Sequence, residues 1–329
     1  MVISREPKVA VVGATGAVGN QIVELIAARA FPYSELKLFA ASAGSAGTLE
    51  AGDDEYLIDR FEDPGDLSGY DVAFLAVPED PALEIINARP GPLLIDLSAC
   101  SRAPTDAIVS PGITSRERAA ALRGRKLYAI ANPVAHAIAL CLGAIGTTPG
   151  AAATALQGAS ARGRLMIART VDQTTDLLAA RLDLEDDDTQ RAFNAFVRES
   201  ERATAGRIAE QTLAMLSRPA LALSVQLAAI PVLHGTMLAL HVREPAEGWI
   251  DRLRAAPGLL MVEDAEPLSL VDAVGQEAIL VRAEDRAEDR TEHRAAGPVI
   301  WCAFDNTRIA ALCALWIAET FALESPAGH

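Results

Sequence analysis

The sequence has few cysteines and no excess of basic residues. Its 329 residues include four cysteines, none in a C-x-x-C pair, so neither a disulfide framework nor a metal site is expected. The 29 Lys and Arg residues stand against 44 Asp and Glu, a formal charge of −15. Such an acidic chain lacks the positive surface that binds nucleic-acid phosphates. The composition therefore predicts no metal and no nucleic-acid partner.

Long uninterrupted apolar runs are also missing. Residues 127–161 carry no Asp, Glu, Lys or Arg, but Asn132-Pro133 and Pro149-Gly150 interrupt the stretch, which argues against a membrane span. Glu6 and Pro7 interrupt the N-terminal segment, so a secretion signal is not expected. We therefore expect a cytoplasmic protein with no membrane partner.

Apolar residues are abundant, at 50% of the chain, and at roughly 150 residues per domain the length predicts two domains. Apolar runs typical of buried parallel strands occur at 8–12, 36–40, 71–77, 93–97 and 127–130. Helical spacing of apolar residues occurs at 17–29 and about 80–88. This alternation predicts an α/β fold whose first domain is a doubly wound, Rossmann-type nucleotide-binding domain.

The pattern changes after Asn132-Pro133. Long helical segments are expected near 165–180 and 198–216, strand-like runs at 220–227, 238–242 and 299–304, and a final helix at 306–322. We expect a Rossmann-type domain at 1–131, completed by a C-terminal helix within 306–329. An α+β domain for substrate binding and dimerisation would occupy 132–305.

A glycine-rich turn follows the first expected strand. It reads GATGAVG over 13–19 and opens the first expected helix. Glycines let the backbone approach a diphosphate, and the helix N-terminus favours the anion. The turn predicts a dinucleotide site made by Gly13, Thr15, Gly16, Ala17, Val18 and Gly19.

The end of the second expected strand leaves the choice between NAD and NADP open. An acidic side chain there would hold the ribose hydroxyls of NAD, and an arginine would accommodate the 2′-phosphate of NADP. Residues 40–47 contain neither, and Ser42 and Ser45 offer hydroxyl groups only. The predicted cofactor is NADP or NAD, without a charged anchor for its adenosine end.

Seven motifs occur in one order along the chain: GATGAVG at 13–19, SAGSAG at 42–47, IDLSACSR at 95–102, IANP at 130–133, LQGASARG at 156–163, IPVLHG at 230–235 and FDNTRIAA at 304–311. In these motifs the chain resembles aspartate-semialdehyde dehydrogenases, and among them the Usg-like homologues. The resemblance implies a homodimer formed through the second domain. It also implies an NADP-linked reaction in which a cysteine attacks the aldehyde, a histidine acts as acid and base, and phosphate releases an aspartyl phosphate.

Both catalytic residues of that family are replaced here. The nucleophile in its N-P-N-C motif corresponds to Ala135, and the histidine that follows P-V-x-x-G corresponds to Thr236. Alanine cannot form a thioester, and threonine does not titrate near neutrality. The family's substrate-binding arginine corresponds to Ala229, and its arginine for the 2′-phosphate is missing from 42–47. No intact catalytic residue is therefore predicted.

Other family positions are retained as remnants of a substrate pocket. Arg102 matches the phosphate-binding arginine, Gln157 matches the active-site glutamine, and Asn132 matches the asparagine before the proline. Ser160, Asp305 and Asn306 match as well, whereas the family's E-x-x-K stretch falls on Ala203 and Gly206. The retained residues either keep a polar cleft or only cap helices and loops.

Four residues are candidate substitutes for the family's cysteine and histidine: Cys100, Cys141, His136 and His234. Cys141 would lie about 120° round the helix and roughly 9 Å along it from Ala135, too far to replace it. Cys100 accompanies Arg102 but has no evident base. His136 and His234 either line the pocket as a base or pack at a helix start and a strand end.

Three functions remain open from these residues. The favoured one is a catalytically impaired homologue of the NADP-dependent dehydrogenase, binding a nucleotide or metabolite in a regulatory role. The second is an active oxidoreductase that acts on an aldehyde or oxo group with His136 or His234 as its base. The third is a structural partner of a biosynthetic enzyme.

Overall fold

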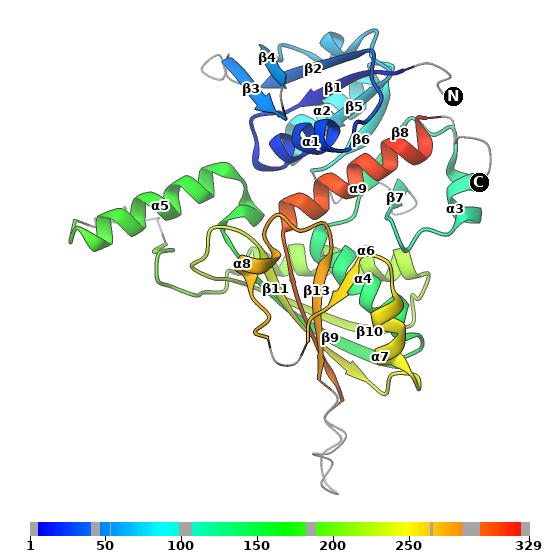
Figure 1. Ribbon diagram of the computed structural model, residues 1–329, viewed down its shortest axis with the longest axis vertical. Coiled ribbons are helices and arrows are strands. Elements are labelled where there is room, and N and C mark those ends of the chain that lie inside the picture. The colour runs from blue at the N-terminus through cyan, green and yellow to red at the C-terminus, as the bar shows by residue number, and fades with distance from the viewer. Residues whose placement is uncertain are drawn as a thin grey trace, which may run out of the picture. The chain divides into compact units, whose positions relative to one another are not determined.

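The computed structural model describes residues 6–40, 47–52, 54–98, 107–181, 189–263, 266–284 and 297–323 (Figure 1). The chain divides into two compact units. The first comprises residues 1–131 and 310–329, and the second comprises residues 132–309. Helix α9 (Asn306–Phe321) begins in the second unit and belongs to the first from Ala310 onward.

The first unit is built on an eight-stranded sheet in the order β3-β4-β2-β1-β5-β6-β8-β7. Its strands are β1 (Lys8–Val12), β2 (Glu35–Ala40), β3 (Gly47–Ala51), β4 (Asp54–Arg60), β5 (Val72–Leu75), β6 (Leu93–Asp96), β7 (Ile108–Val109) and β8 (Leu127–Ile130). Its helices are α1 (Ala17–Ala28), the 3₁₀ helix η2 (Pro64–Leu67), α2 (Glu79–Ala88) and α3 (Arg116–Leu122). Neighbouring strands run parallel, except that β3 and β4 are antiparallel.

The direction of winding reverses at β1. The chain passes from β1 through α1 to β2 on one side, and from β5 through α2 to β6 on the other side of β1. Right-handed crossovers therefore place α1 and α2 on opposite faces. Ile85 of α2 and Leu67 of η2 pack against Ala10 and Val12 of β1. The predicted doubly wound domain is confirmed.

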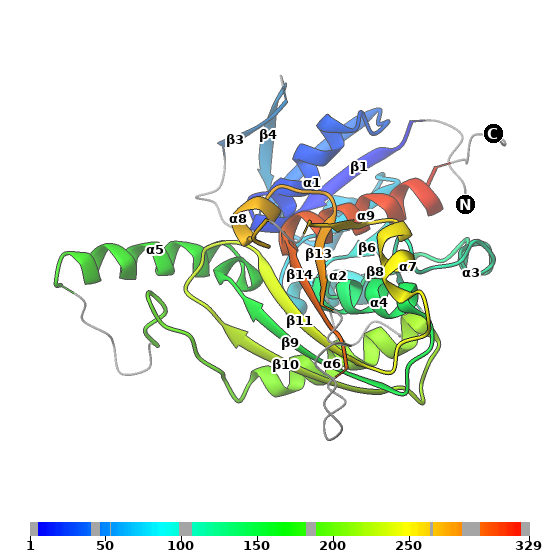
Figure 2. The same ribbon diagram turned by 60° about the horizontal axis from the view of Figure 1, so that its bottom comes forward.

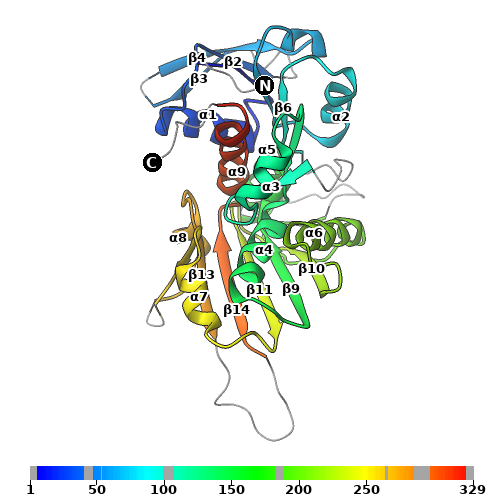
Figure 3. The same cartoon turned by 90° about the vertical axis from the view of Figure 1, so that its right-hand side faces the viewer.

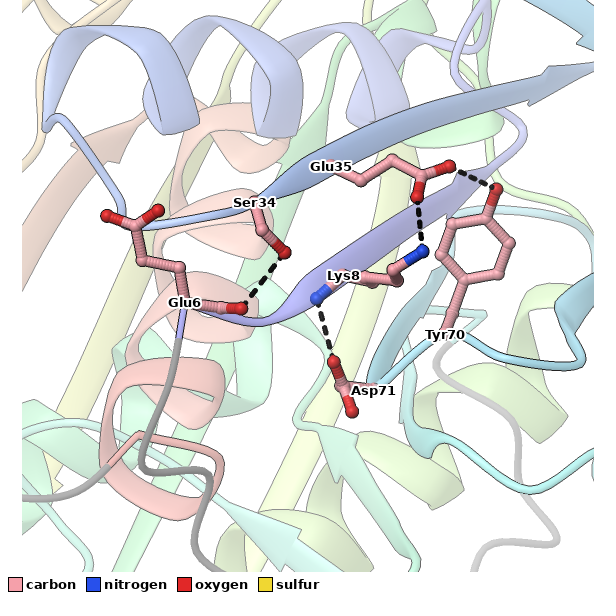
Figure 4. A network of polar contacts seen from close by, with 6 residues as sticks. All are labelled: Glu6, Lys8, Ser34, Glu35, Tyr70 and Asp71. Carbon is pink, nitrogen blue, oxygen red and sulfur yellow. Dashed lines mark hydrogen bonds and ion pairs between the residues drawn. The ribbon is translucent and has the colours of Figure 1, made fainter.

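A polar network fastens the amino-terminal end of β1 (Figure 4). The Lys8 ammonium contacts Glu35 Oε2 at 2.8 Å, and the Lys8 backbone N–H donates to Asp71 Oδ2 at 2.8 Å. The Tyr70 hydroxyl donates to Glu35 Oε1 at 3.3 Å. The hydrogen bond from Lys8 lowers the pKa of Glu35, whereas burial and the Glu35 charge raise the pKa of Tyr70 to about 12. The network joins β1, β2 and the start of β5 at the end of the sheet opposite the glycine-rich turn.

Five elements of the first unit were not expected from the sequence: β3, β4, β7, α3 and the short 3₁₀ helix η2. The β3–β4 hairpin forms the sheet edge, and most of its residues are exposed, including Leu57. An exposed edge lacks the continuous apolar run that marks a buried parallel strand. Strand β7 has two residues, too few for a periodic pattern.

The second unit has a mixed six-stranded sheet in the order β10-β9-β11-β14-β13-β12. Its strands are β9 (Gly150–Gln157), β10 (Ala222–Ala229), β11 (Thr236–Arg243), β12 (Leu259–Met261), β13 (Ile279–Glu284) and β14 (Val299–Phe304). Its helices are α4 (Pro133–Ile145), the 3₁₀ helix η4 (Ala159–Arg162), α5 (Arg164–Leu178), α6 (Glu201–Leu216), α7 (Trp249–Ala255) and α8 (Leu270–Ala273). The β9–β10 and β12–β13 pairs are parallel and the other pairs antiparallel, which confirms the α+β character expected of this region.

Helices α4 and α6 pack together against one face of this sheet (Figure 3). Cys141 of α4 lies with its sulfur 3.6 Å from that of Cys302 in β14. Residues that alternate toward the other face include the exposed Ala152, Ser224 and His241. Helix α5 extends away from the sheet (Figure 2), and only Thr170 and Gln173 of this helix are buried.

The part of α9 in the first unit is an apolar, buried helix. The Phe321 ring stacks on that of Tyr128 at the end of the sheet, with ring centroids 4.2 Å apart. Leu315 and Ile317 are fully buried. Despite this burial, no helix in the described part of the chain combines the length and apolar character needed to cross a membrane.

Candidate functional site

The glycine-rich turn joins β1 to α1 in the first unit. Gly13 has a φ of +87°, and a Cβ added there would lie 2.3 Å from the carbonyl oxygen of Ala76. A Cβ added at Gly19 would lie 2.1 Å from the carbonyl oxygen of Gly13. Both positions therefore require glycine, because neither has space for a Cβ atom. Gly13 also requires it for its left-handed backbone conformation.

The same turn presents backbone donors at the start of α1. Gly16 is the N-cap of the helix, and its N–H donates to the Gly13 carbonyl at 2.9 Å. The N–H groups of Ala17, Val18 and Gly19 belong to the first helical turn, which has no partner for them within the helix. Thr15 lies between Gly13 and the N-cap. A dinucleotide diphosphate suits this cradle because the helix N-terminus favours anions.

The turn also lies where a doubly wound sheet binds its ligands. The winding reverses between β1 and β5, and Gly13 packs against the end of β5 at Ala76. Ligands of such sheets bind at the carboxyl ends of the strands beside this reversal. Other predicted site residues, Ser42, Ser45, Cys100 and Arg102, lie outside the described residues.

In the second unit three positions that the sequence resemblance singles out lie side by side at the ends of strands. Gln157 of β9 is the register partner of Ala229 in β10 and of Thr236 in β11. Gln157 precedes the other two residues by more than 70 positions in the sequence, so sheet pairing alone brings it beside them. These three positions carry the amide group of Gln157, the methyl group of Ala229 and the hydroxyl group of Thr236.

Thr236 is fully buried, and its hydroxyl oxygen has no hydrogen-bond partner among the residues that the structure describes. A buried hydroxyl without a partner costs free energy. It also lacks the near-neutral pKa that lets a histidine exchange a proton. The side chain present at this family position therefore provides no acid or base.

The other family position, Ala135, lies in the first turn of α4. Asn132 caps this helix, because its Oδ1 accepts the N–H of Val134 at 2.9 Å. The Asn132 N–H in turn donates to Gln211 Oε1 at 2.8 Å. Ala135 is fully buried and carries only a methyl group. Asn132 thus has a structural role as a cap, beside a position without a nucleophile.

The substitute groups considered from the sequence are poorly suited to catalysis. His136 is buried, and this burial lowers its pKa to about 4, so its imidazole is neutral and weakly basic near pH 7. His234 is exposed at the strand end. Cys141 is fully buried, and its contact with Cys302, together with burial, raises the pKa of the Cys302 thiol. A thiol buried in this way is a poor nucleophile, because a substrate cannot reach it.

Several retained polar residues bond to one another within the second unit. The Ser160 hydroxyl donates to Asn306 Oδ1 at 2.8 Å, and both residues are buried. Asp305 Oδ1 accepts the Thr307 N–H at 3.0 Å and the Arg308 N–H at 3.0 Å. Ser160 and Asp305 thus stabilise a loop and the start of α9. Ala203 and Gly206, at the family's E-x-x-K positions, are exposed on α6.

A small cavity of about 30 Å³ adjoins Gln157 and Ala229. Its lining includes three charged residues that were not singled out from the sequence: Arg162, Arg191 and Glu201. Arg162 lies inside the LQGASARG motif, so the sequence offered a signal for it. Arg191 and Glu201 belong to no such motif, and only the tertiary structure places them at the cavity. Elsewhere in the described ranges, no group of three or more His, Cys, Asp or Glu side chains could hold a metal ion.

Comparisons with known proteins agree with these features. The family model described as "Semialdehyde dehydrogenase, NAD binding domain" matches residues 8–121. An aspartate-semialdehyde dehydrogenase of Legionella pneumophila is 29% identical over 96% of this chain and 96% of its own length. A USG-1 protein homolog of Azotobacter vinelandii is 32% identical over 94% of this chain and 96% of its own length. The chain belongs to the aspartate-semialdehyde dehydrogenase family.

This family member also shares its fold with solved structures. Aspartate semialdehyde dehydrogenase II of Vibrio cholerae, in a crystal structure described as complexed with ASA, superimposes with a TM-score of 0.83 at 24% identity. The match covers 96% of this chain and 98% of that one. The predicted membership of the family, including similarity to a USG-1 homolog, is confirmed, and the first domain is an NAD-binding domain.

Proposed function

We propose that this protein is a nucleotide-binding member of the aspartate-semialdehyde dehydrogenase family that does not catalyse the cysteine-dependent reaction and has a regulatory role. The observation that carries the proposal is Ala135, a buried methyl group where the family has its nucleophile. Without a thiol or hydroxyl at this position, no covalent bond to the aldehyde carbon can form there. Thr236 and Ala229 lack the proton-exchanging group and the cation of their family counterparts.

The glycine-rich turn supports the nucleotide-binding half of the proposal. Gly13, Gly16 and Gly19 would hold the diphosphate of NAD or NADP against backbone N–H groups at the start of α1. When bound, the nicotinamide of such a cofactor accepts a hydride. A bound nucleotide that is not turned over would act by stabilising one conformation of the chain, as any ligand specific for the folded state does.

The test combines calorimetric titration with NADP and with NAD and an assay of phosphate-dependent oxidation of aspartate semialdehyde. We expect binding of a nucleotide and no turnover. Gly16→Val is the variant expected to lose binding, because a Cβ there would lie 3.1 Å from the Gly13 carbonyl oxygen. Gly206→Ala is the matched control, because a Cβ at this glycine of α6 meets no atom within 4 Å.

Each outcome of this pair of measurements has a definite meaning. Phosphate-dependent turnover by the wild-type protein would overturn the proposal, because it would require a nucleophile other than residue 135. Failure to bind either nucleotide would overturn the nucleotide-binding half and favour a purely structural partner of a biosynthetic enzyme.

We further propose that the protein forms a homodimer through the sheet face of the second unit that α4 and α6 do not cover. On this face a groove of about 580 Å³ is lined by alternating small and polar residues, among them Ala152, Ser224 and His241. Light scattering should give twice the chain mass of 34.6 kDa, and Ala152→Arg should give the single mass. A wild-type protein that stays monomeric at micromolar concentration would contradict this.

A further inference from the structure

A short segment of the first unit is strongly basic. Residues 116–126 hold five of the 29 Lys and Arg residues and one of the 44 Asp and Glu residues, Glu117. Positive charge is thus concentrated at one place on a chain whose net charge is −15. We call the five cations the basic patch, and all but the half-buried Arg118 are exposed: Arg116, Arg118, Arg123, Arg125 and Lys126.

The sheet holds the basic patch away from the glycine-rich turn. The Lys126 carbonyl accepts the N–H of Leu94 at 2.9 Å, and the Lys126 ammonium donates to the Gly91 carbonyl at 2.9 Å. Both bonds lie at the amino-terminal ends of β6 and β8, whereas the turn follows the carboxyl end of β1. Because β1, β5, β6 and β8 run parallel, the patch and the turn lie at opposite ends of the sheet.

Helix α3 carries the first part of the basic patch and is largely open to solvent. Leu122 is its one buried residue, and the helix lies beside β8 at the edge of the first unit (Figure 2). The Ser115 hydroxyl caps it by accepting the Arg118 N–H at 3.2 Å, and the Tyr128 hydroxyl donates to the Leu122 carbonyl at 2.6 Å. These bonds fix both ends of α3. Its exposed side is therefore ordered before a partner arrives, which lowers the entropy cost of binding.

The cations after α3 lie close together. Burial raises the pKa of Tyr128, whereas a backbone hydrogen bond at Arg125 and then the charges of Arg125 and Arg123 act to lower it. Both guanidinium groups therefore lie near the same hydroxyl. Arg89, the exposed C-cap of α2, adds a cation two residues before Gly91. Like charges held this close repel each other, and an anionic partner relieves the repulsion.

The other residues of the segment favour a protein over the other large anionic partners. Residues 116–126 contain no aromatic side chain on which a nucleic-acid base can stack. Their single large apolar side chain, Leu122, is buried, so no apolar side chain is available for insertion into a membrane surface. Residues 119–121 are alanines, whose small side chains let a polypeptide approach between the charges.

We propose that the basic patch docks a short acidic segment of a partner protein. The seven residues of α3 span about 10 Å, so a run of a few Asp or Glu residues matches the patch in length. Charge complementarity of this kind speeds association and selects the partner. The inference goes beyond the proposed function and stands without nucleotide binding, because the two surfaces lie at opposite ends of the sheet.

Fluorescence anisotropy of a labelled deca-glutamate peptide with the full-length protein tests the patch. We expect the wild type to bind the peptide at low ionic strength and to bind it more weakly as salt is added, because the contacts are ionic. The double variant Arg116→Glu, Arg123→Glu should bind about tenfold more weakly. The double variant Arg164→Glu, Arg169→Glu is the matched control, because it changes the net charge equally at two exposed arginines of α5.

Several results would overturn the inference. These are no binding of the peptide by the wild type, unchanged binding by the patch variant, or an equal loss in the α5 control. Tighter binding of a single-stranded oligonucleotide or of phosphatidylserine vesicles than of the peptide would also overturn it, since the patch would then serve another class of partner. So would a lower mass of the patch variant than of the wild type in light scattering, because the occupant would then be a second copy of this chain.

Titration of the patch variant and the wild type with NADP separates this inference from the proposed function. Both arginines of the variant are exposed, so it should keep the circular dichroism spectrum and the NADP affinity of the wild type. Peptide binding without NADP binding overturns the proposed nucleotide function and leaves the docking surface standing. NADP binding without peptide binding overturns the docking surface alone.

Discussion

The glycine-rich turn of the first unit and the strand ends of the second unit present their chemistry in different ways. The turn offers backbone N–H groups, and its glycines are also required by packing against Ala76 and within the turn. The second unit offers side chains instead, and Thr236 at a strand end and Ala135 in the first turn of α4 are both fully buried. A site made of backbone persists with the fold, whereas side-chain chemistry can be replaced while the fold remains.

The largest expected effect tests the requirement for glycine in the turn. Gly13→Val should lower the free energy of unfolding by roughly 4 kcal/mol, because it adds left-handed backbone strain and a clash at a φ of +87° and 2.3 Å from Ala76 O. Denaturant titration measures this. Gly143→Ala in α4 is the control, expected to gain about 0.5–1 kcal/mol because its Cβ meets only Leu216, at 3.6 Å. If Gly13→Val left the free energy of unfolding unchanged, the fold would not require glycine in the turn, and the turn would be as replaceable as the side chains of the second unit.

The next effect concerns His136, beside the position of the missing nucleophile. Its folded pKa is about 4 against 6.5 for the free side chain, so the unfolded chain takes up the proton first as the pH falls. This contribution to stability is complete above pH 6.5 and decreases by about 3 kcal/mol by pH 4. Denaturation at pH 7, 5.5 and 4 should show a flatter pH profile for His136→Gln than for the wild type.

The exposed His234 supplies the matched control for that experiment. His234→Gln changes a side chain outside the core and outside the sheet face proposed to form the dimer, so it should not flatten the pH profile. Identical profiles for wild type and His136→Gln would mean that His136 titrates normally. It would then become a credible base, and the reading of this protein as an active oxidoreductase would gain weight.

A smaller effect on stability tests whether Ser160, which matches a family position, serves the fold or a ligand. Ser160→Ala removes the 2.8 Å hydrogen bond to Asn306 and leaves a buried acceptor without this donor, which should cost about 1–3 kcal/mol of unfolding free energy. Ser68→Ala, at an exposed position directly after η2, should change stability by less than about 0.5 kcal/mol. A neutral Ser160→Ala would show that this retained residue does not serve the fold and would point to a ligand.

The smallest effect has the opposite sign. Thr236→Val should raise stability by about 1 kcal/mol, because it removes a buried hydroxyl that has no partner. Thr212→Val is the matched control and should lose about 1 kcal/mol, since the equally buried Thr212 hydroxyl donates to the Ile208 carbonyl at 2.8 Å. Destabilisation by Thr236→Val would indicate that the hydroxyl serves an interaction in the folded protein.

Elements with a clear local signature were predictable from the sequence. The runs at 8–12 and 36–40 became β1 and β2, because strands buried on both faces are continuously apolar. The helix after the glycine-rich turn became α1 through its regular apolar spacing. The β3–β4 hairpin escaped prediction because the sheet edge faces solvent and imposes little apolar pattern.

The sequence by itself determined the Rossmann-type first domain and the glycine-rich turn, and it predicts that Ala135 and Thr236 stand in place of the family's cysteine and histidine. Each of these features depends either on residues that are neighbours in the sequence or on the residue type at a single position. Only the tertiary structure aligned Gln157 with Ala229 and Thr236 and brought Arg191 beside Arg162 and Glu201. That alignment depends on strand pairing and on the contact between Phe196 and Ala229, which join residues distant in sequence, and no local pattern encodes such contacts.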